Sequence, residues 1–154
     1  MPSRRVQIRM SDEELERFLA QERTVTCATV GPNGRPHLMP LRYVPEGRNM
    51  LAWTFAKSQK TRNLERDPHA TLQVEAGEEY GELRGTMLEC DVELERDHER
   101  VARLGLELMR RYSAGASAEN LEAGVRAQAP KRVGMRFTPT RVVSWDHRKL
   151  GDTY

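Results

Sequence analysis

The sequence predicts a mainly β domain of the α+β class, in which six mostly antiparallel strands form a barrel or a sandwich. Six short segments carry the apolar or alternating patterns of strands, and most are joined by turns rather than by long helices. In residues 83–94, for example, apolar side chains alternate with Glu89, Asp91 and Glu93. The chain has no GxGxxG or Walker-type loop. We therefore expect an antiparallel architecture with helices inserted at the side, not a doubly wound sheet.

The elements follow one another at regular spacing. The predicted strands are residues 25–30, 35–44, 50–56, 70–76, 83–94 and 133–145. The predicted helices are residues 12–21, a short helix between 58 and 68, residues 98–112 and residues 118–128. Residues 1–10 are basic and are expected to be loose.

The first two strands should form a hairpin around residues 31–34 (GPNG), which are strong turn formers. Pro36 and Pro40 lie inside the second of these strands and cannot donate ladder hydrogen bonds. That strand is therefore predicted to be an edge strand, or to be bulged or interrupted. Residues 45–49 (PEGRN) are expected to make the next turn.

The composition is that of one globular domain over residues 1–154, with tails near residues 1–10 and 146–154. The chain is 38% hydrophobic and 31% charged, and its net charge of +2 is too small to indicate nucleic acid or an anionic membrane as partner. No apolar run is long enough to cross a bilayer. Cys27 and Cys90 fall in strand patterns without CxxC spacing, so we expect buried free thiols, a cytoplasmic protein and no metal site.

The charges at the start of the short helix are opposite in sign to those usually found at a helix N-terminus. At the first helix, residues 11–14 (SDEE) form a capping box, with acids where the helix dipole is positive. Around the cap Ser58, by contrast, stand Lys57, Lys60 and Arg62. A helix start with free N–H groups, a hydroxyl and three cations suits a phosphate. The alternative is a solvated basic helix whose cations pair with nearby carboxylates.

Several segments together resemble a known family, the flavin and deazaflavin split-barrel oxidoreductases of the pyridoxamine-phosphate-oxidase-like superfamily. The matching segments are residues 25–37 (VTCATVGPNGRPH), 58–60 (SQK) with 63–64 (NL) and 67–68 (DP), 83–85 (LRG) and 144–150 (SWDHRKL). The resemblance covers nearly the whole chain. It implies a six-stranded split β-barrel that forms a homodimer with two cofactor sites between the subunits.

The resemblance also implies which residues contact the cofactor. Its phosphate would lie at Lys57, Ser58 and Lys60, and Arg62 would meet further negative charge. The ring system would lie along two strands, whose candidate contacts are Met39, Pro40, Leu41, Thr54 and Ala56. Trp145, with Arg148 and the segment through Tyr154, would cover the partner's groove, or else belong to an exposed terminus.

The ending of the chain resembles the branch that uses the deazaflavin coenzyme F420, which would transfer a hydride to a small conjugated acceptor. Flavin mononucleotide (FMN) is the alternative cofactor. A second alternative is a non-catalytic module that binds a flavin, or binds haem through His37 or His69. No catalytic residue is assigned, although His37, Tyr43, Tyr80 and His147 could each donate a proton.

Overall fold

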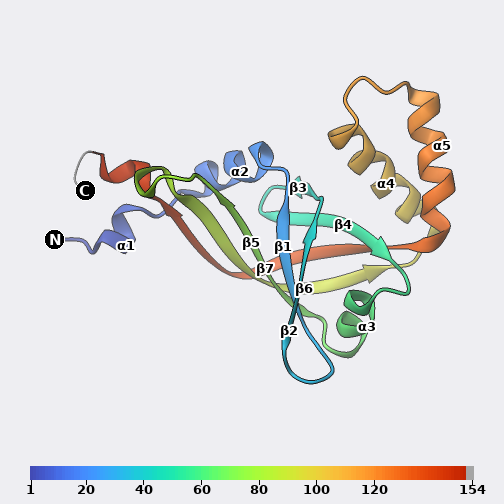
Figure 1. Ribbon diagram of the computed structural model, residues 1–154, viewed down its shortest axis with the longest axis horizontal. Helices are drawn as coiled ribbons and strands as arrows, with labels where there is room; N and C mark the ends of the chain where they lie inside the picture. The colour runs from blue at the N-terminus through green and yellow to red at the C-terminus, as the bar shows by residue number, and fades with distance from the viewer. Residues whose placement is uncertain (152–154) are drawn as a thin grey trace.

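A computed structural model of the protein describes residues 1–151, and within them the chain forms one curled antiparallel sheet with helices at its sides (Figure 1). The sheet has seven strands in the order β2-β1-β5-β6-β7-β4-β3. The strands are β1 (Val25–Val30), β2 (Pro36–Leu41), β3 (Val44–Glu46), β4 (Asn49–Phe55), β5 (His69–Ala76), β6 (Arg84–Glu95) and β7 (Arg132–Asp146). The mainly β half-barrel confirms the predicted fold class.

The number of strands differs from the prediction, because residues 35–44 do not form one strand. The chain leaves the ladder at Arg42 and Tyr43, so that β2 pairs with β1 while β3 pairs with β4 at the opposite edge of the sheet. Tyr43 is fully buried; its N–H donates to the hydroxyl of Tyr112 (3.0 Å) and its own hydroxyl donates to the carbonyl of Leu19 (2.6 Å). These tertiary bonds replace the ladder bonds that a continuous strand would make. The prediction of an edge strand is confirmed for β2.

Four of the five α-helices lie where the sequence patterns placed them, whereas α1 (Arg4–Gln7) and the 3-10 turns were not predicted. The other four helices are α2 (Asp12–Gln21), α3 (Gln59–Arg66), α4 (His98–Tyr112) and α5 (Ala118–Gln128), with 3-10 turns η1 (Tyr80–Glu82), η2 (Ala129–Lys131) and η3 (His147–Leu150). The capping box of α2 is present: Ser11 Oγ accepts from the N–H of Glu14 (3.1 Å), and Glu14 Oε1 accepts from the N–H of Ser11 (3.0 Å). The first ten residues are not uniformly loose, because they contain α1 and because Met10 is buried in the core.

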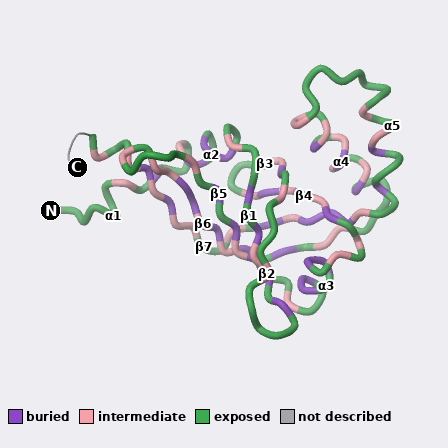
Figure 2. The backbone as a smooth tube through the Cα atoms, viewed as in Figure 1, coloured by how far each residue is buried: buried purple, intermediate pink, exposed green. Residues whose placement is uncertain are grey.

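The core lies inside the curl of the sheet. Alternate residues of the strands are buried in it, α2 closes it with Leu15, Phe18 and Leu19, and Figure 2 colours the buried segments purple. On β4 the inward residues are Met50, Ala52 and Thr54.

A second layer, made by α4 and α5, covers the outer face of β4 (Figure 1). Trp53 points outward into this layer, where a Cβ at Gly105 of α4 would lie 2.1 Å from its ring. The helix can approach the strand so closely only because residue 105 has no side chain. Trp53 and Thr54 are thus adjacent in sequence, but their side chains lie on opposite faces of the sheet.

Within residues 1–151, none of the helices combines the length and apolar character that a bilayer crossing requires. Over the same residues, no group of three or more His, Cys, Asp or Glu is arranged to hold a metal ion.

Candidate functional site at the start of α3

The start of α3 is a cluster of hydroxyl groups. Ser58 is the N-cap, and its Oγ accepts from the N–H of Thr61 (3.2 Å). The same oxygen lies 3.1 Å from Thr61 Oγ1 and 3.5 Å from Thr54 Oγ1. Thr61 Oγ1 donates to the carbonyl of Phe55 at the end of β4 (2.9 Å). The helix start is thereby fixed against the strand that precedes it.

Lys60 is buried beneath this cluster. Its exposed fraction is 6%, and its Nζ donates to Thr54 Oγ1 (3.2 Å). Among the described residues no carboxylate forms an ion pair with it. Burial lowers the pKa of the ammonium, because the charged form loses its hydration. The neighbouring thiol of Cys27 is also buried, which raises its pKa to about 11 although the charge of Lys60 acts in the opposite direction.

The other two cations at this helix start lie at the surface. Lys57 and Arg62 are exposed, and within residues 1–151 neither makes a side-chain hydrogen bond or an ion pair. Ala56, between them and the strand, is half-buried, and its N–H donates to the carbonyl of Lys131 (2.8 Å). The structure therefore separates one buried cation from two solvated ones.

Three further polar residues, to which the sequence patterns assigned no role, hold α3 against the sheet or brace it internally. Asn63 is fully buried and donates through Nδ2 to Thr29 Oγ1 on β1 (3.1 Å), and Gln59 Nε2 donates to Asn63 Oδ1 (2.8 Å). Arg66 donates to the carbonyl of Val30. The available signal was an asparagine on the same side of the helix as Leu64. Because these bonds hold α3 in place, they position Lys60.

Three of the residues predicted to contact a ring lie on the edge strand β2, whereas Thr54 lies on β4 and Ala56 directly follows it. Met39 pairs with Cys27, Pro40 with Thr26 and Leu41 with Val25. Pro40 and Leu41 line a cavity of about 360 Å³ between β2, β4 and α4. Arg42 and Arg132 also line this cavity, and the sequence patterns did not indicate Arg132, at the start of β7. Its guanidinium carbon lies 3.7 Å from the centre of the Phe55 ring.

Trp145 does not join the other predicted residues within one chain. It pairs with Gly85, twelve residues along β7 from Val133, which is the partner of Thr54. A Cβ at Gly85 would meet the indole at 2.5 Å, which explains the glycine of the LRG segment. Within one chain, Trp145 therefore lies at the opposite end of β7 from the partner of Thr54. The segment after Gly151, through Tyr154, lies outside the described residues.

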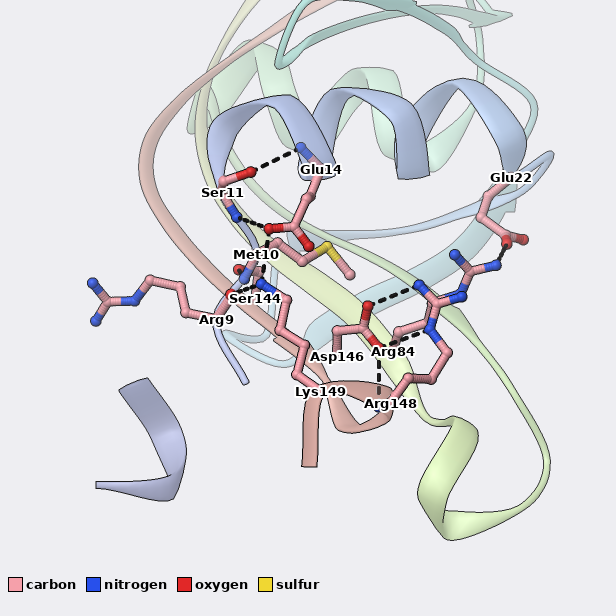
Figure 3. A network of polar contacts seen from close by, with 10 residues as sticks. All are labelled: Arg9, Met10, Ser11, Glu14, Glu22, Arg84, Ser144, Asp146, Arg148 and Lys149. Carbon is pink, nitrogen blue, oxygen red and sulfur yellow. Dashed lines mark hydrogen bonds and ion pairs between the residues drawn. The ribbon is translucent and has the colours of Figure 1, made fainter. Parts of the chain in front are cut away.

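Asp146, which follows Trp145 in sequence, belongs to a network of polar contacts and ion pairs (Figure 3). Asp146 is buried and accepts from Arg148 Nε (2.9 Å), Arg148 Nη2 (2.8 Å) and the Arg148 N–H (3.1 Å), and these bonds hold the pKa of its carboxyl below the ordinary value. Lys149 Nζ donates to Glu14 Oε1 (2.8 Å) and to the carbonyl of Arg9 (2.7 Å). The network joins the end of the chain to the start of α2.

The candidate proton donors and haem ligands are scattered. Tyr43 donates to a core carbonyl, which makes it structural. Tyr80 and His147 contact one another near the C-terminal end, with ring centres 4.8 Å apart. His69 is exposed and lies 2.6 Å from a carboxylate oxygen of Asp67, which raises its pKa, and no apolar pocket surrounds it. His37 is half-buried on β2, opposite Thr29.

Comparison with known proteins gives one matching family and one solved structure that is similar over nearly its whole length. The profile of the family described as pyridoxamine 5'-phosphate oxidase matches residues 11–146. The conserved hypothetical protein Rv2991 of Mycobacterium tuberculosis shares 39% identity with this chain, and the match covers 99% of this chain and 95% of that one with a TM-score of 0.90.

Two more distant structures share the fold. An F420 reductase matches with 23% identity and a TM-score of 0.67, over 82% of this chain and 94% of its own. The haem storage protein HutZ of Vibrio cholerae matches with 19% identity and a TM-score of 0.67, over 86% of this chain and 93% of its own. No curated protein matched the sequence.

Proposed function

The chain belongs to the pyridoxamine 5'-phosphate oxidase-like split-barrel family, and on this premise we propose that it is a reductase dependent on the deazaflavin coenzyme F420. The reduced coenzyme would supply a hydride to a small unsaturated or conjugated acceptor. The protein would bind and orient both molecules and exclude water from the space between them.

The observation that carries this proposal is the buried ammonium of Lys60. A buried charge without a counterion costs several kcal/mol, and proteins normally pair it. Here the ammonium has only the hydroxyl of Thr54 within the described residues. It lies beside Ser58 and the N-terminus of α3, where helix N–H groups also favour an anion. A phosphate at this position would supply the missing negative charge.

The surrounding residues fit a long anionic cofactor. Ser58 and Lys60 would bind the phosphodiester, and the exposed Lys57 and Arg62 would meet the oligoglutamate tail. Pro40, with Met39, Leu41, Thr54 and Ala56 nearby, would lie along the ring system. FMN would use the same phosphate site but would leave the two exposed cations without a role.

We propose that the complete site requires a homodimer. The edge strand β2 exposes Leu38 (59%) and Met39 (44%), and Val30 at the end of β1 is also exposed (40%). Exposed apolar side chains on an edge strand are a liability unless another surface covers them. A second subunit would cover this edge and would bring its own Trp145 to the cofactor. Sedimentation at micromolar concentration checks this assembly, and a strict monomer that binds cofactor fully would contradict it.

Parallel titrations of the apoprotein with F420 and with FMN, followed by fluorescence, test the cofactor. Lys60→Met should weaken F420 binding by about 1.5–3 kcal/mol, because it removes a charge-assisted contact while keeping the side-chain volume. Lys57→Met is the matched control, since it removes an exposed lysine three residues away and should cost less than about 1 kcal/mol.

The outcomes of these titrations distinguish the two cofactors and test the phosphate site. Binding of F420 that depends on Lys60 would support the proposal. Preference for FMN would replace the deazaflavin by a flavin in the same site. Binding of neither cofactor, or equal losses in the two lysine variants, would overturn the assignment of the phosphate site.

A further inference from the structure

The cavity between β2, β4 and α4 has a strongly one-sided charge. Two arginines, Arg42 and Arg132, line it, and none of its lining residues is acidic. A second cavity of about 450 Å³, on the other side of α4, shows the contrast, because there arginines and glutamates are mixed. In that cavity Arg136 donates to Glu46 Oε1 (2.8 Å). Of these two cavities, the first presents cations that no carboxylate of its own lining matches.

Contacts with neighbouring side chains fix the position of Arg132 in this cavity. Its guanidinium lies over the rings of Phe55 (3.7 Å from the ring centre) and Trp53 (5.3 Å), and its Nη2 donates to Gln128 Oε1 (2.8 Å). Its Nε is buried and has no hydrogen-bond partner. Within residues 1–151 no carboxylate pairs with it. A stacked, half-buried guanidinium without a carboxylate partner is suited to a planar oxyanion.

Flat and apolar side chains form part of the wall of this cavity, beside its polar residues. The rings of Trp53 and Tyr112 contribute to this part, together with Pro40 and Leu41. Tyr112 is fixed, because its hydroxyl accepts from the N–H of Tyr43 (3.0 Å) and donates to the carbonyl of Arg23 (2.7 Å). The guanidinium of Arg42 lies over the Tyr112 ring, 5.1 Å from its centre. A cavity of about 360 Å³ with such walls accepts one small planar molecule.

We propose that this cavity binds a small conjugated carboxylic acid, whose carboxylate meets Arg132 and Arg42 and whose planar part lies against Trp53 and Tyr112. This inference rests on the proposed function for one step only, that the bound acid is the acceptor of the hydride. Because Pro40 and Leu41 belong both to the cavity and to the proposed ring site, an acid bound here lies beside the ring. Binding of the acid itself does not require the cofactor.

The test uses trans-cinnamate as probe and its neutral amide, cinnamamide, as control, titrated into the full-length apoprotein by ligand-observed NMR. Cinnamate should bind at least about tenfold more tightly than cinnamamide, because a carboxylate on an arginine makes charge-assisted hydrogen bonds that an amide cannot. Arg132→Gln should reduce cinnamate affinity by about tenfold and leave cinnamamide unchanged.

Arg136→Gln is the matched control, since Arg136 lies on the same face of β7 but lines the other cavity. It should leave cinnamate binding unchanged. Equal binding of acid and amide, or equal effects of the two arginine variants, would overturn the proposal. Thermal melts of both variants show whether either substitution has simply unfolded the protein.

A carboxylate could also come from the glutamate tail of F420, so the same variants are titrated with F420 and with the coenzyme lacking its glutamates. If Arg132→Gln weakens only the tail-bearing coenzyme and leaves cinnamate unaffected, the cavity is a tail site and our proposal is wrong. Cinnamate binding without any deazaflavin binding would support the cavity while overturning the proposed function. Deazaflavin binding without cinnamate binding would do the reverse.

Discussion

Two buried charges at opposite ends of the sheet differ in one respect, which is whether the chain supplies a counterion. Asp146, in β7, is buried, but Arg148 gives it two side-chain hydrogen bonds and a backbone hydrogen bond. Lys60, in α3, is buried to a similar extent, yet its only polar contact within the described residues is the hydroxyl of Thr54. The fold alone satisfies the first arrangement, whereas we propose that an anion from outside completes the second. On this proposal the contrast separates a structural charge from a binding charge.

The largest expected effect on stability is at the paired charge. Asp146→Asn should lower the free energy of unfolding by about 2 kcal/mol, because an amide cannot accept both guanidinium bonds and leaves a buried donor facing Arg148. Chemical denaturation measures the change. If stability were unaffected, the network in Figure 3 would not contribute to the fold, and Asp146 would not be a stabilising paired charge to set against Lys60.

Lys60→Met should act in the opposite direction in the apoprotein. Removing an uncompensated ammonium while keeping the methylene groups should raise the free energy of unfolding by about 1 kcal/mol. Denaturation of apoprotein measures this change, with Lys57→Met as the neutral control. A clear loss of stability would mean that the ammonium is already compensated without a ligand.

The contributions of Asp146 and Lys60 to the free energy of unfolding should change at opposite ends of the pH scale. The pKa of Asp146 is lowered in the fold, so its stabilising contribution is present above the ordinary carboxyl value near 3.8 and is lost as pH falls through the lower folded value. The stability difference between wild type and Asp146→Asn should therefore shrink in acid. The pKa of Lys60 is lowered below 10.5, so the cost of burying its charge is relieved as pH rises through the folded value.

The stability difference between wild type and Lys60→Met should accordingly shrink in alkali, by up to about 1 kcal/mol. Denaturation of each pair across the pH range measures both differences. Using differences between matched proteins removes the effects of Cys27 and the other groups that titrate in alkali. Two differences that narrow at the same end of the scale would contradict the comparison.

The smallest effect is expected at the rim of the C-terminal network. Lys149→Ala should lower the free energy of unfolding by about 0.5–1 kcal/mol, because the ion pair with Glu14 is only partly shielded from water. The pKa of Glu14, lowered chiefly by Lys149, should move back toward its ordinary value in the variant, which NMR titration can follow. An unchanged Glu14 titration would show that the ion pair does not form in solution.

Local patterns in the sequence predicted much of the fold for physical reasons that act over a few residues. The acids and serine of residues 11–14 fix the start of α2, and the prolines of β2 keep it at an edge. The same reasoning gave Ser58 as the cap of α3. It failed at residues 42–43, where the partners of Tyr43 come from α2 and α4, distant in sequence.

Local sequence patterns predicted only part of the candidate site. The unusual cations around Ser58 indicated an anion site, but the charges alone do not say which lysine is buried. Nor could the sequence bring Arg132 to Phe55 and Trp53, since these residues belong to strands paired across about 80 residues of chain. Conversely, Trp145 was grouped with the site by resemblance, and the register of β7 places it at the other end of the sheet.

The sequence by itself determined the β class, most of the element boundaries, the edge strand and the location of the basic helix start, because propensity, capping and alternation depend on near neighbours. Only the tertiary structure decided which charges have partners. Burial and ion pairing depend on which segments the sheet brings together, so Asp146 became a satisfied structural charge and Lys60 a charge that an anion would complete.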